Sequence, residues 1–345
     1  MASFTRANLP KSLSGALKST GKRSYAVPSF APSSASPFQV FDRNLKRSQR
    51  DRAAANKEKS RLTDYVKDDV AQSMVDRLLD IKERYPQVLD VGSGPGFLAK
   101  HLDSEITKKV VMVDSSKGML YRDEDVEFDI PVERIHLDEE ELASHFEENS
   151  QDAIMSCLAL HWINDLPGAL IQIKQTLRPD GVFIGSMFGG DTLFELRTAL
   201  QLAELEREGG ISPRVSPMTD SQSVTSLLNR AGFALSTVDV DEIQIAYPSI
   251  YELMDDLKWM GEGNAVVNRR KTLKPETVMA AAEIYRDLHG LEDGTIPATF
   301  QIMHMIGWKP SPNQPKPAKR GSGTTNLADV IGDEGAQPLK PDGEK

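Results

Sequence analysis

The residues best suited to chemistry lie in one short segment, Val88–Gly96, where an apolar run ends in a glycine turn. Glycine tolerates positive φ and lets a ligand approach the backbone closely. The third glycine stands one position too early for the dinucleotide spacing G-x-G-x-x-G, and no Gly-Lys-Ser/Thr follows as in a Walker loop. The acidic Asp90 beside the turn favours a ligand that carries an ammonium group over a pyrophosphate.

Two further carboxylates end strand-like runs farther along the chain. Asp114 closes the run VVMVD, where an acidic side chain accepts hydrogen bonds from two ribose hydroxyls. Asp138 closes RIHLD and is placed to meet an exocyclic adenine amine. The alternative role for both residues is to cap a helix that follows the strand. The glycine turn and the acids together predict a site for an ammonium-bearing nucleoside.

A regular alternation of strand-like and helix-like runs has to position these residues. Each of the five strand-like runs is followed by a helix-like one, and the strand-like runs are QVLDV, VVMVD, VERIHLD, DAIMSCL and GVFIGSM. Such alternation calls for a parallel sheet with helices on both faces. Two later β-like runs, ALSTVDV and FQIMHMIGWKP, fit a closing antiparallel pair. We therefore expect an α/β fold with a Rossmann-like, seven-stranded sheet, mostly parallel with an antiparallel edge strand.

Composition divides the chain into unlike parts. Its 345 residues carry a net charge of −10, but the first 41 hold five Lys and Arg and no acid. A basic, Ser- and Ala-rich leader before an acidic body is typical of a mitochondrial transit peptide, and an acidic body argues against nucleic-acid binding. No apolar run is long enough to span a bilayer. We expect a transit peptide and linker at 1–37, a charged, solvated helical segment at 38–63, a main domain at 64–309 with a helical insertion at about 208–295, and a disordered tail at 310–345.

The glycine turn and the strand ends resemble those of class I S-adenosylmethionine-dependent methyltransferases, over roughly Asp64–Met187. The resemblance implies that S-adenosylmethionine is the cofactor and that the chain has the methyltransferase fold. Gly92 and Gly94 would face its methionine part, Asp114 its ribose and Asp138 its adenine. The full expected set of cofactor-binding residues is Asp90, Gly92, Ser93, Gly94, Gly96, Asp114, Ser115, Asp138 and Ser156. The stretch LALHWINDLPGAL is also similar to the malonyl-carrier-protein methyltransferases of biotin synthesis.

A narrower resemblance covers the chain from Phe41 to Pro310. The blocks FDRNLKRSQRDRAA, GGDTLFELR, EREGGISPR and GTIPATFQIMHMIGWKP look like the family of mitochondrial complex I assembly factor 5. This resemblance implies a matrix protein that hydroxylates an arginine of the iron–sulfur subunit of complex I, next to the quinone site. It also leaves room for peripheral contact with the inner membrane.

The residues themselves leave other functions open. A methyl transfer to a protein side chain or a carrier-bound acid needs little beyond alignment of the acceptor, and a non-catalytic assembly chaperone is a third hypothesis. The candidates that face the substrate are His161, Trp162, Asp191 and Glu195, whose alternative roles are packing a turn or capping a helix. We assign no metal site, because the His-x-Asp spacing at His136 ends a strand where the adenine would lie.

Overall fold

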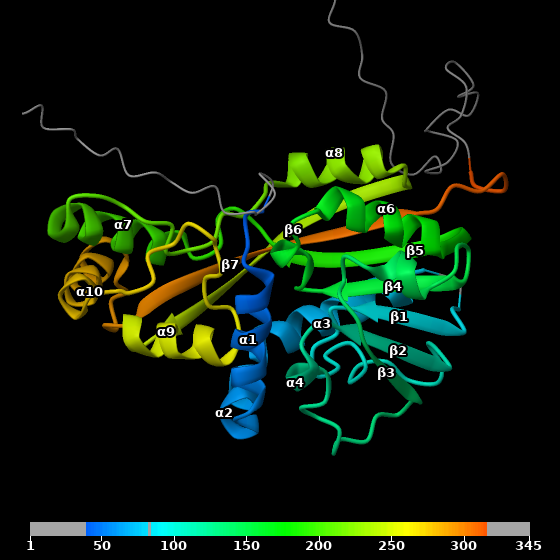
Figure 1. The fold of residues 1–345 in the computed structure, drawn as a ribbon, viewed down its shortest axis with the longest axis horizontal. Coiled ribbons are helices and arrows are strands. Elements are labelled where there is room, and N and C mark those ends of the chain that lie inside the picture. The colour runs from blue at the N-terminus through cyan, green and yellow to red at the C-terminus, as the bar shows by residue number, and fades with distance from the viewer. Residues whose placement is uncertain (1–38, 82–83, 316–345) are drawn as a thin grey trace, which may run out of the picture. The chain divides into compact units, whose positions relative to one another are not determined.

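The computed structural model describes residues 39–81 and 84–315. The predicted transit peptide and linker lie outside the described residues, and so does the predicted tail from residue 316 on. The part that is described holds one seven-stranded sheet in the order β3-β2-β1-β4-β5-β7-β6 (Figure 1). Its strands are β1 Gln87–Val91, β2 Lys109–Asp114, β3 Val132–His136, β4 Gln151–Cys157, β5 Leu177–Phe188, β6 Ala234–Tyr247 and β7 Ile296–Trp308.

Strands β1 to β5 are parallel, and β7 runs antiparallel between β5 and β6. The mostly parallel α/β sheet predicted from the alternation is therefore confirmed. The antiparallel strand is not itself the edge, however, because β6 pairs with its outer side. Segment 97–102, expected as a helix, instead forms successive turns in which Lys100 N donates to Gly96 O and His101 N to Leu98 O.

Helices cover both faces of the sheet, as the alternating side chains of the strands require. Val88 and Met112 point to the face covered by α3, whereas Leu89 and Val111 point to the face covered by α6 and α8. The helices are α1 Arg43–Ala54, α2 Lys57–Leu62, α3 Tyr65–Leu79, α4 Lys117–Leu120, α5 Leu142–His145, α6 Leu166–Thr176, α7 Phe194–Glu208, α8 Ser221–Ala231, α9 Ile250–Trp259 and α10 Pro275–His289, with a 3-10 turn at Leu160–Trp162.

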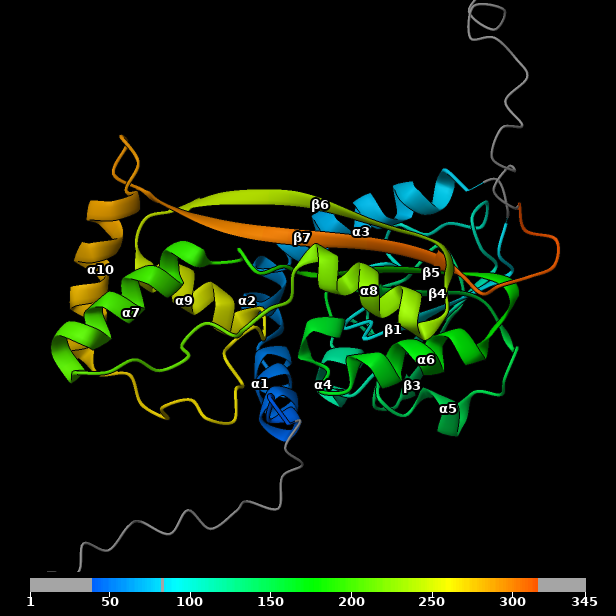
Figure 2. The same cartoon turned by 90° about the horizontal axis from the view of Figure 1, so that it is seen from above.

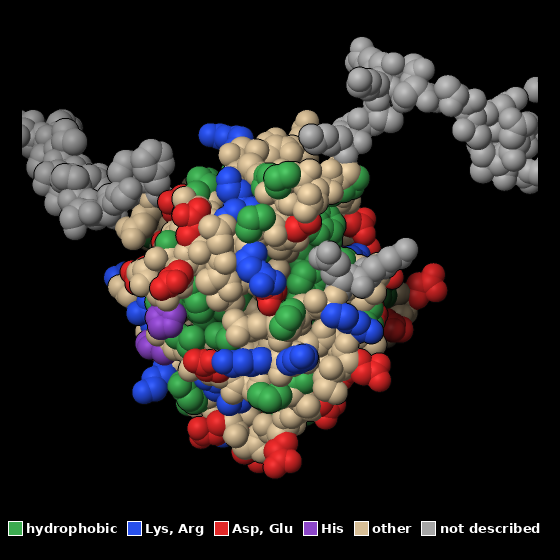
Figure 3. Space-filling model, turned by 90° about the vertical axis from the view of Figure 1, so that its right-hand side faces the viewer, with side chains coloured by type: hydrophobic (Ala, Val, Ile, Leu, Met, Phe, Trp, Pro, Cys, Tyr) green, Lys and Arg blue, Asp and Glu red, His purple; other side chains and the backbone are tan. Residues whose placement is uncertain are grey.

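The two last strands extend well beyond the rest of the sheet. Strands β6 and β7 lie side by side along their whole length, and α7, α9 and α10 gather around their far ends (Figures 1 and 2). The stretch 208–295 thus contains the edge strand β6 as well as three helices. On the face drawn in Figure 3, Lys and Arg side chains are interspersed with Asp and Glu rather than separated by sign.

The N-terminal helices α1 and α2 are packed against the domain, so the expectation of a solvated segment is wrong for their inner face. Lys46, Ala53 and Ala54 are buried. Asp51 fixes the helix by accepting hydrogen bonds from Ser116 Oγ at 2.7 Å and Gly118 N at 2.9 Å. Helix α1 therefore lies over the carboxyl ends of the parallel strands, where open α/β sheets bind their ligands.

Candidate functional site

The glycine turn after β1 has the backbone shape that its sequence predicts. Gly92, Gly94 and Gly96 all have positive φ, which residues with a Cβ rarely adopt. A Cβ on Gly92 would also collide with the methyl group of Ala159. The turn is held from below, where the backbone nitrogens of Gly92 and Ser93 donate to Val113 O at 2.8 and 3.0 Å. A bulkier residue at Gly92 would close the space above the turn.

Asp90 lies beneath this turn and is completely buried. Neither of its carboxylate oxygens has a hydrogen-bond partner among the described residues. Burial, reinforced by the nearby charge of Asp114, raises the pKa of Asp90 well above its ordinary value. A buried carboxylate without a partner is costly, and a bound cation would relieve that cost. Asp90 therefore has the surroundings expected of a group that receives an ammonium.

Asp114 ends β2 with its carboxylate turned toward the glycine turn. It accepts hydrogen bonds from Gly94 N at 2.8 Å and Ser116 N at 2.7 Å. Its second oxygen also receives Nη2 of Arg50, from helix α1, at 2.6 Å. Burial raises the pKa of Asp114 although Arg50 opposes that shift. The carboxylate expected to hold a ribose therefore faces the glycine turn but is paired with an arginine.

A second arginine of α1 holds the acids that follow β3. Arg43 forms ion pairs with Asp138 and with Glu139, and Glu139 also accepts Ser115 Oγ at 3.0 Å. Burial opposes the ionisation of Glu139, but Arg43 and Arg50 outweigh it and hold its pKa below the ordinary value. Glu139 is buried, whereas Asp138 is partly exposed. Glu139 is therefore the more enclosed acid on the side expected for the adenine.

The remaining residues of the expected cofactor set lie around the same strand ends. Ser156 is buried and donates its hydroxyl to Val91 O at 2.7 Å, so it ties β4 to β1. Ser93 and Gly96 belong to the turn, and Ser115 follows Asp114. The sheet therefore brings all nine residues of the set to one edge, as parallel neighbouring strands should.

The space between the glycine turn and α1 is too small for a nucleoside in this arrangement. The cavity measures about 20 Å³, roughly room for one water molecule. Side chains of α1 take up the rest, since Arg50 Nη2 lies 3.8 Å from where a Cβ of Gly94 would stand. The donor set, the orphaned Asp90 and the glycine turn fit S-adenosylmethionine, but Arg43 and Arg50 must give way to admit it.

Trp162 and Glu262 form the wall between this cavity and a larger one. Glu262 accepts Trp162 Nε1 at 2.7 Å and pairs with Lys67 at 2.6 Å. Lys46 of α1 lies 3.4 Å from the centre of the Trp162 ring and donates to Gly261 O at 3.0 Å. Burial lowers the pKa of Lys46 well below its ordinary value. Helix α1 therefore contacts the wall shared by both cavities.

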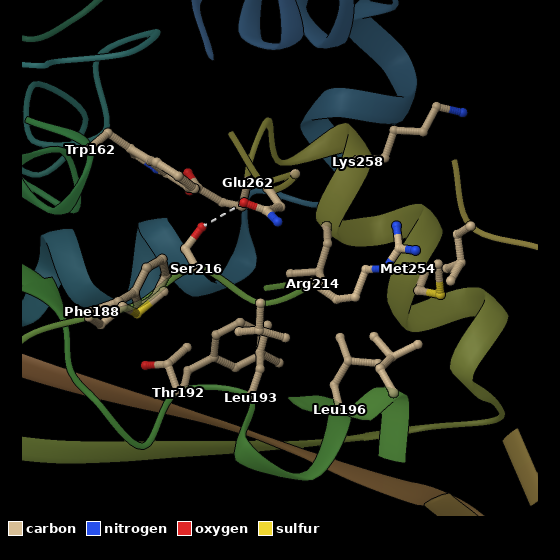
Figure 4. Close-up of a pocket in the computed structure, with 18 residues that line it drawn as sticks. Trp162, Phe188, Thr192, Leu193, Leu196, Arg214, Ser216, Met254, Lys258 and Glu262 are labelled. Atoms are coloured by element: carbon tan, nitrogen blue, oxygen red, sulfur yellow. Dashed lines mark hydrogen bonds between the residues drawn. The ribbon is translucent and has the colours of Figure 1, made fainter. Parts of the chain in front are cut away.

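The larger cavity has a volume of about 180 Å³ and mostly apolar walls (Figure 4). Trp162 and Glu262 close its inner end, while Arg214 crosses it from the loop after α7 and Lys258 points away from it. Its apolar lining comes from β5, α7, α9 and β7, and consists mainly of Phe188, Leu193, Leu196, Leu200, Met254, Leu257 and Phe300. Such a slot beside the glycine turn suits the apolar part of a small ligand.

The four candidates for substrate contact are distributed differently. Trp162 lines the larger cavity, and His161 is buried behind it, 3.4 Å from Glu262. Asp191 accepts a hydrogen bond from Gln301 Nε2 at 2.9 Å, and Glu195 is buried with its carboxylate on Thr299. Neither of these two acids lines the cavity.

Several residues of the site were missed by sequence reasoning. These are Arg43, Lys46 and Arg50 on α1, and the buried pair Lys67 and Glu262. A signal for the first three existed, because positions 43, 46, 47 and 50 share one face of a helix. The charged segment was interpreted as solvated, and so that face was not assigned to the site.

Within residues 39–81 and 84–315, no three His, Cys, Asp or Glu side chains are grouped so that they could hold a metal ion. None of the helices in those ranges is both long and apolar enough to cross a bilayer.

Comparison with known proteins matches the chain to a domain family that covers part of it and to a protein family that covers most of it. The methyltransferase domain family matches residues 89–185, which run from β1 into β5. The chain is 48% identical over 312 residues to the mitochondrial arginine-hydroxylase NDUFAF5 of Rattus norvegicus, covering 90% of each chain. It is 48% identical to the human protein of that name, over 85% of this chain and 84% of the relative.

The chain belongs to the NDUFAF5 arginine-hydroxylase family. This assignment confirms the narrower of the two sequence resemblances. The chain is also 29% identical to a malonyl-[acyl-carrier protein] O-methyltransferase of Gallionella capsiferriformans, over 79% of this chain and 93% of the relative. A putative methyltransferase from Bacillus halodurans superposes with a TM-score of 0.47 at 17% identity, covering 68% of this chain and 98% of the other.

Proposed function

We propose that this protein binds S-adenosylmethionine at the glycine turn. Asp90 would receive the ammonium group, Gly92 and Gly94 would border the methionine part, and Asp114 would bind the ribose. Asp138 and the adjacent Glu139 would face the adenine. The observation that carries the proposal is the fully buried Asp90, whose carboxylate has no partner among the described residues although it lies directly under the turn.

We further propose that the protein hydroxylates an arginine side chain, as the relatives named arginine-hydroxylase do. Support comes from 48% identity over 90% of both chains. The substrate would be the iron–sulfur subunit of mitochondrial complex I, at an arginine near the quinone site. The apolar cavity behind Trp162 would receive the substrate, with His161 supporting the indole. Asp191 and Glu195 stay predictions as substrate contacts.

We infer a location in the mitochondrial matrix from the relatives' names, which include the word mitochondrial. Peripheral contact with the inner membrane stays a prediction.

A methyltransferase activity is the second candidate. The methyltransferase domain family matches residues 89–185, which include all nine proposed cofactor residues, and a malonyl-carrier-protein methyltransferase is similar over most of the chain's length. When bound, the cofactor supplies a methyl group activated on a sulfonium. The chain's own residues would then hold the acceptor in line with it and exclude water.

One experiment separates these activities. The purified protein is incubated with S-adenosylmethionine, a mitochondrial extract that supplies oxidant, and a peptide of the iron–sulfur subunit that contains the candidate arginine. Intact mass then shows a gain of one oxygen for hydroxylation or one methylene for methylation. A peptide of unchanged mass contradicts both activities and favours a chaperone. A peptide with Lys in place of the arginine is the matched control.

A further inference from the structure

The proposed cofactor carries one group for which the sequence offers no partner. Its amino-acid end holds an ammonium and a carboxylate, and its ribose holds two hydroxyls. Asp90 and Asp114 suit the ammonium and the hydroxyls. The carboxylate needs a cation, because burying an unpaired charge is costly. The inference that follows rests on the cofactor proposal and concerns which side chain meets that carboxylate.

Among the residues that the structure describes, five cationic side chains line the cavity above the glycine turn, four of them from α1. They are Arg43, Lys46, Arg47, Arg50 and Lys67. Their positions and present partners distinguish them.

Two of these cations belong to the wall toward the larger cavity. Lys67 is paired with Glu262 at 2.6 Å, and Lys46 donates to two backbone carbonyls beside the Trp162 ring. Both ammonium groups thus already have partners, and these partners would stay in place when the cofactor binds.

Two others belong to the side expected for the adenine. Arg43 pairs with Asp138 and Glu139, and Arg47 lies 3.3 Å from Asp138. Both acids follow β3, and the methionine part would lie at the other end of the site, over the turn after β1.

Arg50 is the cation at the glycine turn itself. Its Nη2 lies 2.6 Å from Asp114 Oδ2 and 3.8 Å from where a Cβ of Gly94 would stand. The side chain is 13% exposed, and the adjacent Asp51 anchors the helix to Ser116 and Gly118. The guanidinium is therefore delivered from a fixed helix to the place where the amino-acid end of the cofactor would lie.

We propose that Arg50 binds the carboxylate of the cofactor and that cofactor binding exchanges one ion pair for another. In the structure Arg50 holds Asp114. On binding, the guanidinium moves from Asp114 to the cofactor carboxylate, and Asp114 becomes available to the ribose hydroxyls. In the same step Asp90 receives the ammonium, and Asp114 keeps the hydrogen bonds from Gly94 N and Ser116 N while it accepts those of the ribose hydroxyls. Arg50 thereby selects ligands that carry an amino-acid carboxylate.

The test compares two ligands that differ only in that group. Dissociation constants are measured by calorimetry for S-adenosylmethionine and for decarboxylated S-adenosylmethionine, which keeps the sulfonium and the ammonium. The native protein should bind the complete cofactor about ten-fold more tightly or better, as expected for a charge-assisted contact. In Arg50→Leu the ratio of the two constants should fall to about one. In Arg50→Lys an intermediate ratio should return.

Two controls isolate the contact from general charge effects. Arg52→Leu removes the same charge from the exposed face of the same helix and should keep the native ratio. Arg50→Lys keeps the charge and serves as the readout if Arg50→Leu does not fold. Circular dichroism establishes folding for each variant.

Three results would overturn the inference. If Arg50→Leu keeps the native ratio, the carboxylate is bound elsewhere. If Arg50→Leu binds both ligands more tightly by the same factor, Arg50 only competes for Asp114. If the native protein binds neither ligand, the cofactor proposal fails and this inference fails with it, a result that differs visibly from loss of selectivity alone.

Discussion

The indole nitrogen of Trp162 donates a 2.7 Å hydrogen bond to the carboxylate of Glu262, and both residues line both cavities. The wall between the cavity at the glycine turn and the apolar cavity is therefore a polar contact between two buried side chains. Lys67, which also lines the cavity at the glycine turn, neutralises Glu262. We therefore expect a substitution of Trp162 or Glu262 to change the stability of the fold and the proposed binding of both S-adenosylmethionine and the substrate.

Replacing Glu262 by Gln should lower the free energy of unfolding by about 3 kcal/mol, because it leaves the buried Lys67 without an opposite charge. Urea denaturation followed by circular dichroism measures the loss. The matched control is Glu133→Gln, which removes an acid from a half-exposed pair with Lys109 and should cost less than about 1 kcal/mol. Equal losses of unfolding free energy in the two variants would show that the buried pair stabilises the fold no more than the exposed pair does.

The same pair predicts a pH dependence of stability. Burial alone would raise the pKa of Glu262, but Lys67 and His161 outweigh it and hold the pKa well below its ordinary value. Stability from this group is therefore complete above the unfolded pKa of about 4.3 and is lost as the pH falls toward the folded pKa. Thermal melts between pH 6 and pH 3 should show a steeper decline for the native protein than for Glu262→Gln. Parallel curves would contradict the assignment.

Gly92→Ala should destabilise the fold by more than its backbone cost alone. A Cβ there meets both an unfavourable positive φ and the Ala159 methyl group. Gly209 provides the control, since it also has positive φ but no atom of the described residues lies within 4 Å of where its Cβ would stand. Gly209→Ala should cost about 1–2 kcal/mol, and Gly92→Ala should cost clearly more in urea denaturation. A smaller or equal loss at position 92 would mean that the turn is not tightly held.

Asp114→Asn should abolish stabilisation by the cofactor. A ligand present at a hundred times its dissociation constant stabilises the native state by about 2.7 kcal/mol, so S-adenosylmethionine should raise the melting temperature of the native protein. The variant should show no shift at the same concentration. Asp125→Asn changes an exposed carboxylate and should behave like the native protein. An undiminished shift in Asp114→Asn would remove this residue from the cofactor site.

Leu196→Trp should block the substrate while sparing the cofactor. Leu196 lines the apolar cavity of about 180 Å³, which an indole would largely fill. Substrate modification, measured by peptide mass, should fall at least ten-fold, whereas the thermal shift with S-adenosylmethionine should persist. Leu202→Trp places the same side chain on an exposed position of the same helix and should leave modification unchanged. Full activity of Leu196→Trp would place the substrate outside this cavity.

The strands and the glycine turn were predictable because their signals are local. Each of β1, β2 and β4 is an apolar run with its own boundary, and Gly92 to Gly96 have no other structural use than a tight bend. Strand β6 was harder to predict in full, because no described strand pairs with its outer side and many of its residues are polar. Its second half, Asp241–Tyr247, is a strand only because β7 pairs with it.

The role of α1 could not be read from the same kind of signal. Its arginines have ordinary helix propensity. Their role in the site depends on ion pairs with acids that lie 64 to 96 positions away in the sequence. Only the parallel sheet brings the ends of β2 and β3 to one edge beneath the helix. Ion pairs between residues far apart in the sequence produce no local sequence pattern. The one local sign is the spacing of the basic residues at positions 43, 47 and 50, which places them on the same face of α1.

The place of β7 has a consequence for incomplete chains. Although β7 is the last strand along the described chain, it lies inside the sheet, between β5 and β6. A truncated chain that ends before Ile296 would leave the edges of β5 and β6 that face β7 without a partner strand. Such unpaired edges pair with other chains and cause aggregation. Premature stop codons even late in the gene should therefore give insoluble protein and not a weakened enzyme.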